Sequence, residues 1–194
     1  MKRPRVIVHA PRAGSGPGVR EVEAHGETHA LSPLGDAVNG LLYWEQPRVF
    51  RRAWRLISER GEHMLLHGQG LTRRKLRAET PSVTWTLDRS WTGDVTLADL
   101  EGRELASIPR GWLWRRRLEL PDGPTLAWRR HWNGDRTLED VEAHELLRLR
   151  RWFAFFRFQG TVEVSDAART RPDLPQLLAV TFFARLSEPR GHGG

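Results

Sequence analysis

From residue 41 onward, apolar and polar positions alternate in short runs, which is the spacing of β-strands. The run from Trp112 to Leu120 is typical, with Trp112 and Trp114 on one side and Arg115 and Arg117 on the other. Turn signals such as Asn133-Gly134 recur at intervals of roughly 8–12 residues. This pattern predicts a mainly β domain of about ten to twelve antiparallel strands, arranged as a barrel or a sandwich.

A different pattern occupies Asp173 to Leu186, where nearly every position is apolar. A helix there would be hydrophobic around its whole circumference, so it must be buried on all sides. At 1.5 Å per residue it would be roughly 21 Å long, shorter than a hydrocarbon core of roughly 30 Å. Asp173 and Gln176 have the spacing of a capping box, and Pro175 would lie in the first turn. We therefore expect protein to surround this helix.

A closed antiparallel barrel of about 10–12 strands is wide enough to hold such a helix, whereas the interior of eight strands is filled by its own side chains. We predict this barrel over residues 41–187, with the central helix at 173–186. Residues 1–38 are rich in glycine, proline and charge, which predicts a flexible tail, and 188–194 form a second one.

One apolar stretch does not fit simple alternation. We interpret Leu146–Phe158 as a single strand in which Phe153 and Phe155 face away from the core, so that either the N-terminal tail or a partner covers them. Four tryptophans alternate in step with inward leucines, which predicts that their rings fill the space around the helix: Trp112, Trp114, Trp128 and Trp132.

The net charge of +7 raises the expectation of an anionic partner. Lys2 and Lys75 are the lysines among 31 basic residues, so arginine dominates, although a GC-rich genome would give the same bias. The absence of cysteine excludes disulfides and thiolate chemistry. Val6-Ile7-Val8 is too short for a signal peptide, so we expect a cytoplasmic protein. We find no catalytic or cofactor motif and expect a protein that is not an enzyme and carries no cofactor.

The order of these segments resembles a known family. A short strand pair from Tyr43-Trp44 into Phe50–Ser58 precedes a meander of hairpins punctuated by Trp and Gly, then the strand Gly160–Ser165, and directly afterwards the apolar helix Leu174–Leu186. This is similar to the Tubby C-terminal-like superfamily, which includes the LURP-one-related proteins and the phospholipid scramblases. The resemblance implies a twelve-stranded barrel around a hydrophobic helix. It also implies binding of an anionic lipid headgroup, such as a phosphoinositide, at a membrane surface. The calcium loop and palmitoylated cysteines of scramblases are missing.

The best candidate for binding an anion is an outward basic row on neighbouring strands. Like charges placed opposite one another repel, and an anionic ligand would relieve that strain. The alternative is a solvated exterior in which acids from neighbouring strands neutralise the row. The candidate residues are Arg115, Arg117, Arg129, His131, Arg148 and Arg150.

Three further groups deserve a hypothesis each. His63 and His67 share a strand face, but no third zinc ligand is nearby, so we expect structural histidines. The acidic cluster from Asp135 to Glu145 is typical of a charged turn region rather than of an acid–base pair. The nine tryptophans beside many arginines leave a nucleic-acid-binding module as the alternative function, and a barrel with only structural or protein-interaction duties as another.

Overall fold

The computed structural model describes residues 19–24, 27–47, 52–68, 74–110, 115–154 and 157–188. Within these ranges the chain is mainly β, which confirms the predicted fold class. Trp112, Trp114 and Phe155 lie outside the described residues, as do the outer parts of both predicted tails, 1–18 and 189–194.

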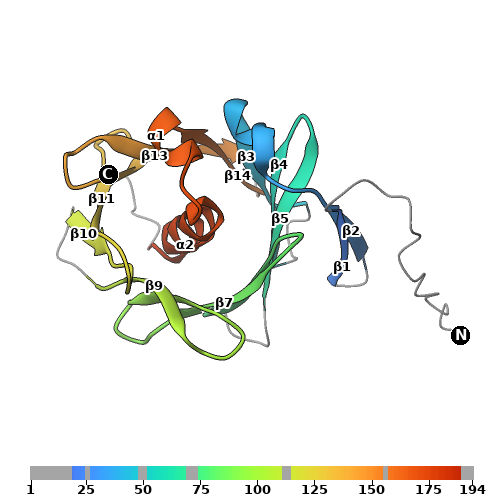
Figure 1. The fold of residues 1–194 in the computed structure, drawn as a ribbon, viewed down its shortest axis with the longest axis horizontal. Coiled ribbons are helices and arrows are strands. Elements are labelled where there is room, and N and C mark those ends of the chain that lie inside the picture. Colours follow the sequence, from blue (N-terminus) through green and yellow to red (C-terminus); the bar gives the residue numbers. More distant parts are fainter. Residues whose placement is uncertain are drawn as a thin grey trace, which may run out of the picture.

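Twelve antiparallel strands form the wall of a nearly closed barrel, in the order β10-β11-β12-β13-β14-β3-β4-β5-β6-β7-β8-β9 (Figure 1). Most neighbours in this order are also consecutive in sequence, as expected for a meander of hairpins. The strands are β3 (Leu42–Glu45), β4 (Ala53–Ser58), β5 (Gly61–Gly68), β6 (Lys75–Glu79), β7 (Thr84–Arg89), β8 (Val95–Ala98), β9 (Glu104–Ile108), β10 (Arg115–Leu118), β11 (Leu126–Arg130), β12 (Arg136–Glu139), β13 (Glu145–Ala154) and β14 (Arg157–Val164).

Two pairings close the ring. β14 pairs with β3, which places Thr161 opposite Tyr43 and joins the two ends of the barrel sequence. At the seam between β9 and β10, Ser107 and Glu119 exchange both backbone hydrogen bonds, at 2.9 and 2.8 Å. The pairing between β9 and β10 is therefore much shorter than the pairing between the other neighbouring strands of the wall.

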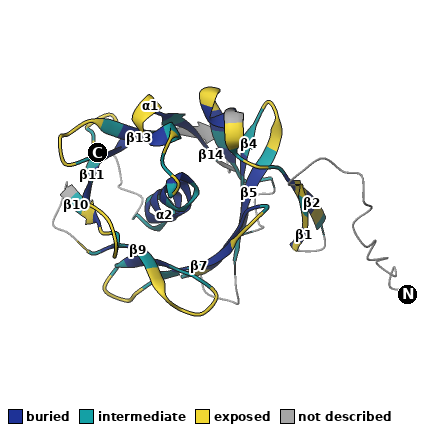
Figure 2. Ribbon diagram, in the orientation of Figure 1, coloured by how far each residue is buried: buried dark blue, intermediate teal, exposed yellow. Residues whose placement is uncertain are grey.

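The helix α2 (Leu174–Ser187) lies inside this ring (Figure 1) and packs against β7, β8 and β9. Its residues from Leu177 to Ala184 are all buried, and the inner face of the wall is buried with them (Figure 2). Phe182 is 1% exposed and stacks on Trp44 of β3, with ring centroids 3.9 Å apart. This arrangement confirms the prediction of a helix that protein surrounds on all sides.

An ionic contact holds the carboxyl end of α2 to the wall. Arg136 of β12 is only 3% exposed, and its guanidinium donates two hydrogen bonds to the Glu188 carboxylate, one of them at 2.9 Å. Arg185 donates a third to Glu188 at 2.6 Å and another to the carbonyl of Gly134 at 3.0 Å. Burial raises the pKa of Glu188, but the hydrogen bond and charge of Arg136 outweigh it and leave the pKa below its ordinary value.

The start of α2 differs in detail from the prediction. Pro175 lies in the first turn as expected, and Asp173 occupies the N-cap position. The Asp173 side chain makes no capping hydrogen bond, however, because Arg171 binds both carboxylate oxygens at 2.9 and 2.7 Å. A four-residue helix, α1 (Asp166–Arg169), precedes it and is capped by the Ser165 hydroxyl.

Part of the predicted tail is a hairpin, so the expectation of a flexible segment over 1–38 does not describe this region. β1 (Arg20–Ala24) pairs with β2 (Glu27–Leu31), and a 3₁₀ helix, η1 (Gly35–Asn39), follows. The hairpin lies outside the ring beside β5 (Figure 1), where Leu31 pairs with Glu62. Val22, Ala24 and Leu31 bury the outward side chain of Leu65.

The apolar stretch 146–158 is also different from the prediction. It is two strands of a hairpin, because β13 ends at Ala154 and β14 begins at Arg157, with Phe153 directly opposite Phe158. Trp128 points into the core as predicted, but the prediction for Trp132 is wrong. It is 95% exposed, because β11 already ends at Arg130 and Trp132 belongs to the following turn.

Candidate ligand-binding surfaces

The structure brings the predicted basic row together on β10 to β13. Arg115 lies opposite Arg129, Arg129 lies opposite Thr137, and Thr137 lies opposite Arg148. Arg117 is exposed on β10 and Arg150 on β13, while His131 follows β11 and shares a 2.9 Å hydrogen bond with Thr137. The register therefore brings Arg115, Arg129 and Arg148 into one row across the strands, whereas Arg117 lies opposite Ala127 and Arg150 lies opposite Thr161.

Carboxylates of the same sheet neutralise much of this row. Arg129 forms an ion pair with Glu139 at 2.8 Å, and Arg150 forms one with Glu163 at 3.0 Å. Arg148 donates to Glu145 at 3.1 Å, and this hydrogen bond raises the pKa of Arg148. These ion pairs already relieve the repulsion between the arginines, which an anionic ligand was expected to do. An anionic ligand would therefore gain less by binding to this row.

A second concentration of arginine lies at one end of the barrel. In an antiparallel meander, every second turn falls at the same end, so the turns after β7, β9 and β11 lie together with the carboxyl end of α2. We call this the basic end, and it is marked by Arg74, Arg89, Arg110, Arg130 and Trp132 in the described residues.

The turn between β7 and β8 organises part of the basic end. Trp91 is 88% exposed, and the Arg74 guanidinium lies 3.1 Å above the centre of its ring. Such a cation–π contact stabilises both groups in an exposed position. Arg110 and Arg89 approach the same turn: a Cβ added to Gly93 would lie 3.8 Å from Arg110 Cδ and 3.9 Å from a terminal nitrogen of Arg89.

Asp94 holds this turn rigid. Hydrogen bonds from the Thr92 hydroxyl, the Arg110 backbone N–H and the Ser90 hydroxyl lower the pKa of Asp94 to about 2. The Arg110 N–H lies 2.6 Å from Asp94 Oδ1 and so fixes the segment after β9 against the turn after β7. The exposed tryptophan and the three arginines are thus presented on a preorganised surface.

The opposite end has the reverse charge. Its turns carry more acids than bases among the described residues, and we call it the acidic end. Asp140, one of these acids, accepts backbone hydrogen bonds from His144 and Glu142, which lower its pKa. The acids from Asp135 to Glu145 do not form one cluster, because Asp135 belongs to the β11–β12 turn and Asp140 and Glu142 belong to the β12–β13 turn at the opposite end. They support turns and ion pairs, as the sequence pattern indicates. The acids of the described turns at this end are Glu59, Asp99, Glu101, Glu119, Asp122, Asp140, Glu142, Asp166 and Asp173.

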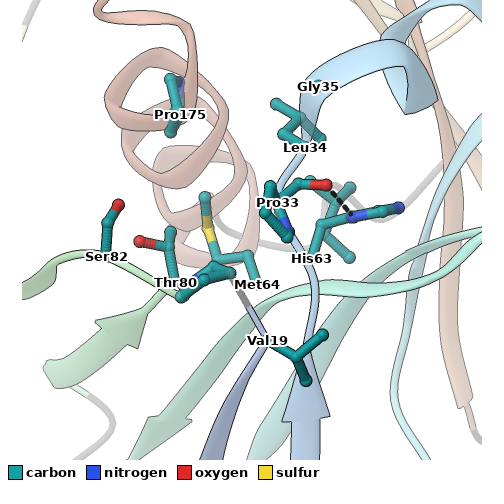
Figure 3. Close-up of a pocket in the computed structure, with 11 residues that line it drawn as sticks. Val19, Pro33, Leu34, Gly35, His63, Met64, Thr80, Ser82 and Pro175 are labelled. Carbon is teal, nitrogen blue, oxygen red and sulfur yellow. Dashed lines mark hydrogen bonds between the residues drawn. The ribbon is translucent and has the colours of Figure 1, made fainter. Parts of the chain in front are cut away.

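A pocket of about 400 Å³ opens at the acidic end, where α2 enters the barrel (Figure 3). Leu56 of β4 and Met64 of β5 line it. Met64 points toward the first turn of α2, which carries Pro175 (Figure 3). Pro33 and Leu34, which follow the β1–β2 hairpin, form one side. The sequence pattern gave no sign of this pocket, since it joins segments that are far apart in the chain.

Both predicted structural histidines have protein partners. His63 is buried, and its Nδ1 lies 3.1 Å from the carbonyl oxygens of both Ser32 and Pro33. These acceptors require the proton on Nδ1, and Nε2 shares a 2.7 Å hydrogen bond with the Ser58 hydroxyl. His63 thereby fixes the side wall of the pocket to β5.

His67 lies further along the same strand face, 2.8 Å from the buried carboxylate of Glu79. Burial raises the pKa of Glu79, but the hydrogen bond and charge of His67 bring it below its ordinary value. His29 of β2 similarly contacts Glu62 at 3.0 Å. No group of three or more metal-binding side chains occurs among the described residues.

The fold thus defines a barrel with an internal helix and two chemically different ends. No protein-family model matches the chain, and neither the curated proteins nor the solved structures contain a match. Within the described ranges, no helix has both the length and the apolar composition to cross a bilayer.

Proposed function

We propose that this protein is a non-enzymatic barrel, related to the Tubby C-terminal-like superfamily, that binds an anionic group through its basic end. The group is a phosphorylated one, either a lipid headgroup at a membrane surface or a soluble phosphorylated molecule. The observation that carries this proposal is the exposed Trp91, covered by Arg74 and flanked by Arg89 and Arg110.

The physical chemistry of this surface supports an interfacial role. Arginine forks pair with phosphate oxygens, and tryptophan rings favour the boundary between headgroups and acyl chains. Trp91 and Trp132 both lie on turns of the same end, so one approach of the barrel brings both rings to a surface. The acidic end faces away in that orientation, which aligns the charge of the molecule with an anionic membrane.

Vesicle sedimentation tests the proposal. The full chain should sediment with vesicles of phosphatidylcholine and phosphatidylserine and much less with phosphatidylcholine alone. Each arginine near the surface contributes about 1 kcal/mol, so the double variant R89Q/R110Q should bind about thirtyfold more weakly. The matched control R60Q/R103Q removes the same charge from the acidic end and should leave binding within about twofold, since screening limits the reach of a charge to about 8–10 Å.

Two further measurements complete the test. Calorimetric titration with inositol trisphosphate distinguishes recognition of a specific phosphorylated group from general attraction to a charged surface. Saturable binding of this soluble compound indicates recognition of the headgroup, whereas binding to anionic vesicles without binding of the soluble compound indicates attraction to surface charge. Equal sedimentation with neutral and anionic vesicles, or equal losses in the two double variants, would contradict the proposal.

Nucleic-acid binding is the second candidate, and the exposed Trp132 favours it. An exposed ring beside arginine can stack on an unpaired base, which contributes about 1–3 kcal/mol per base. This function requires retention on a single-stranded oligonucleotide column and elution that shifts steeply with salt. Elution at low salt, together with saturable vesicle binding, would exclude it in favour of the first.

A further inference from the structure

The pocket at the acidic end is chemically unlike the basic end. None of the 11 residues that line it is Asp, Glu, Lys or Arg (Figure 3). Most of the lining residues are leucine, methionine, valine or proline, and the polar side chains among them are Thr80, Ser82 and His63. Pockets of about 300–1,000 Å³ with this kind of lining are typical binding sites for small molecules.

The polar groups of the pocket limit what its ligand can be. His63 already engages the Ser32 and Pro33 carbonyls and the Ser58 hydroxyl, and the Thr80 hydroxyl donates to the Val83 carbonyl at 3.0 Å. Neither side chain is then available to neutralise a charge. Ser82 lies at the exposed rim, where its hydroxyl can meet one neutral polar group of a ligand. Arg20, whose guanidinium donates to the Thr80 carbonyl at 3.3 Å, is paired with the Glu79 carboxylate and is not part of the lining.

We infer that this pocket binds a small uncharged amphiphile: an aliphatic chain inserted between Met64 and Pro175, and a neutral hydroxyl or carbonyl at the rim beside Ser82. About 400 Å³ corresponds to roughly 13 water molecules at their liquid volume, which suits a chain of moderate length but not a whole phospholipid. The inference concerns a different end, a different ligand class and different residues from the proposed anion surface, so each can fail alone.

The pocket also joins the N-terminal hairpin to the barrel. Val19 precedes β1 and Leu34 follows β2, whereas Met64 and Pro175 belong to the barrel and its helix. A ligand that contacts both parts stabilises the hairpin in its docked position by mass action. Binding should therefore slow hydrogen exchange of the Ser32 amide, which donates to the Glu62 carbonyl at 2.7 Å.

Calorimetric titration with the alkan-1-ols from butan-1-ol to octan-1-ol tests the inference on the full chain. We expect one saturable site, with affinity rising about fourfold for each added methylene until the pocket is full. Octanoate should bind at least tenfold more weakly than octan-1-ol, because its carboxylate finds no cation in the lining.

A pair of adjacent positions gives a matched control. S82W places an indole at the rim of the pocket and should weaken octan-1-ol binding at least tenfold. V83W places the same ring on the neighbouring exposed residue, which does not line the pocket, and should change binding less than twofold. Lack of saturable octan-1-ol binding to the unmodified chain, equal affinity for octanoate, or equal effects of the two variants would each overturn the inference.

Discussion

Replacing Phe182 by alanine tests whether the barrel is built around its helix. The ring is 1% exposed, stacks on Trp44 at 3.9 Å, and meets the edge of Trp54 at 6.5 Å between centroids. Truncation of a fully buried phenylalanine costs about 3–5 kcal/mol, because both transfer energy and cavity formation contribute. Of this, about 0.5–1.5 kcal/mol belongs to each favourable aromatic pair. F182A should thus remove a large part of a total stability of about 5–15 kcal/mol.

The measurement is equilibrium unfolding in urea followed by far-UV circular dichroism, with near-UV dichroism as a probe of tryptophan packing. F182L keeps an apolar side chain but loses the ring contacts, so we expect a cost of about 1.5 kcal/mol from the aromatic pairs. V83A changes an exposed residue and should stay within about 0.5 kcal/mol. A loss below about 1 kcal/mol for F182A would refute the reasoning, since no ring enclosed between wall and helix can be removed so cheaply.

Three other outcomes follow from the structure. Because the pKa of Glu188 is lowered in the folded state, its ion pair stabilises the protein above the unfolded pKa of about 4.3, and this contribution is lost as the pH falls. E188Q should abolish this part of the pH dependence of the unfolding free energy, measured in urea from pH 7 to 3, and an unchanged pH dependence would count against the contact. H29A removes a hydrogen bond to the Glu62 carboxylate that contributes about 1.5–3 kcal/mol, so backbone amides of β2 should exchange hydrogen faster while those of β12 do not. Equal acceleration in both strands would contradict a hairpin that docks separately from the barrel. W132A should change the free energy of unfolding by less than about 0.5 kcal/mol while reducing sedimentation with anionic vesicles. A large loss of stability with unchanged sedimentation would instead indicate that this ring points into the core.

The central helix was predictable because its signal does not depend on distant partners. From Leu177 to Ala184 every residue except Thr181 is apolar, so the helix has no polar face, and it is too short to cross a bilayer. An enclosing protein wall is the remaining environment for it. The strands of that wall were predictable from alternation for the same reason, since alternation is a local property. Boundaries were less reliable: alternation ran past Arg130 into the turn and placed Trp132 on the wrong side.

The hairpin β1–β2 was missed because its buried face is only weakly apolar. Val22 and Ala24 alternate with the exposed charges Glu21 and Glu23, and in β2 the polar His29 shares the buried face with Leu31, so the sequence of this segment resembles a polar tail. The buried side chains of the hairpin pack instead against Leu65 on the outside of β5. The neutralisation of the basic row could not be foreseen either, because the pairing of Arg129 with Glu139 and of Arg150 with Glu163 depends on the register between strands.

The order of elements along the chain sets a constraint on how the molecule is made. The twelve wall strands are synthesised before the central helix α2. The emerging strands therefore cannot pack around their core until α2 has left the ribosome. Until then the inward apolar side chains of the twelve wall strands remain exposed, and the strands can pair wrongly, a hazard that grows with slow, non-local assembly. The join of Tyr43 to Thr161 can form only after nearly all the intervening sequence has been translated. Partial products of translation should therefore depend on chaperones far more than the finished protein does.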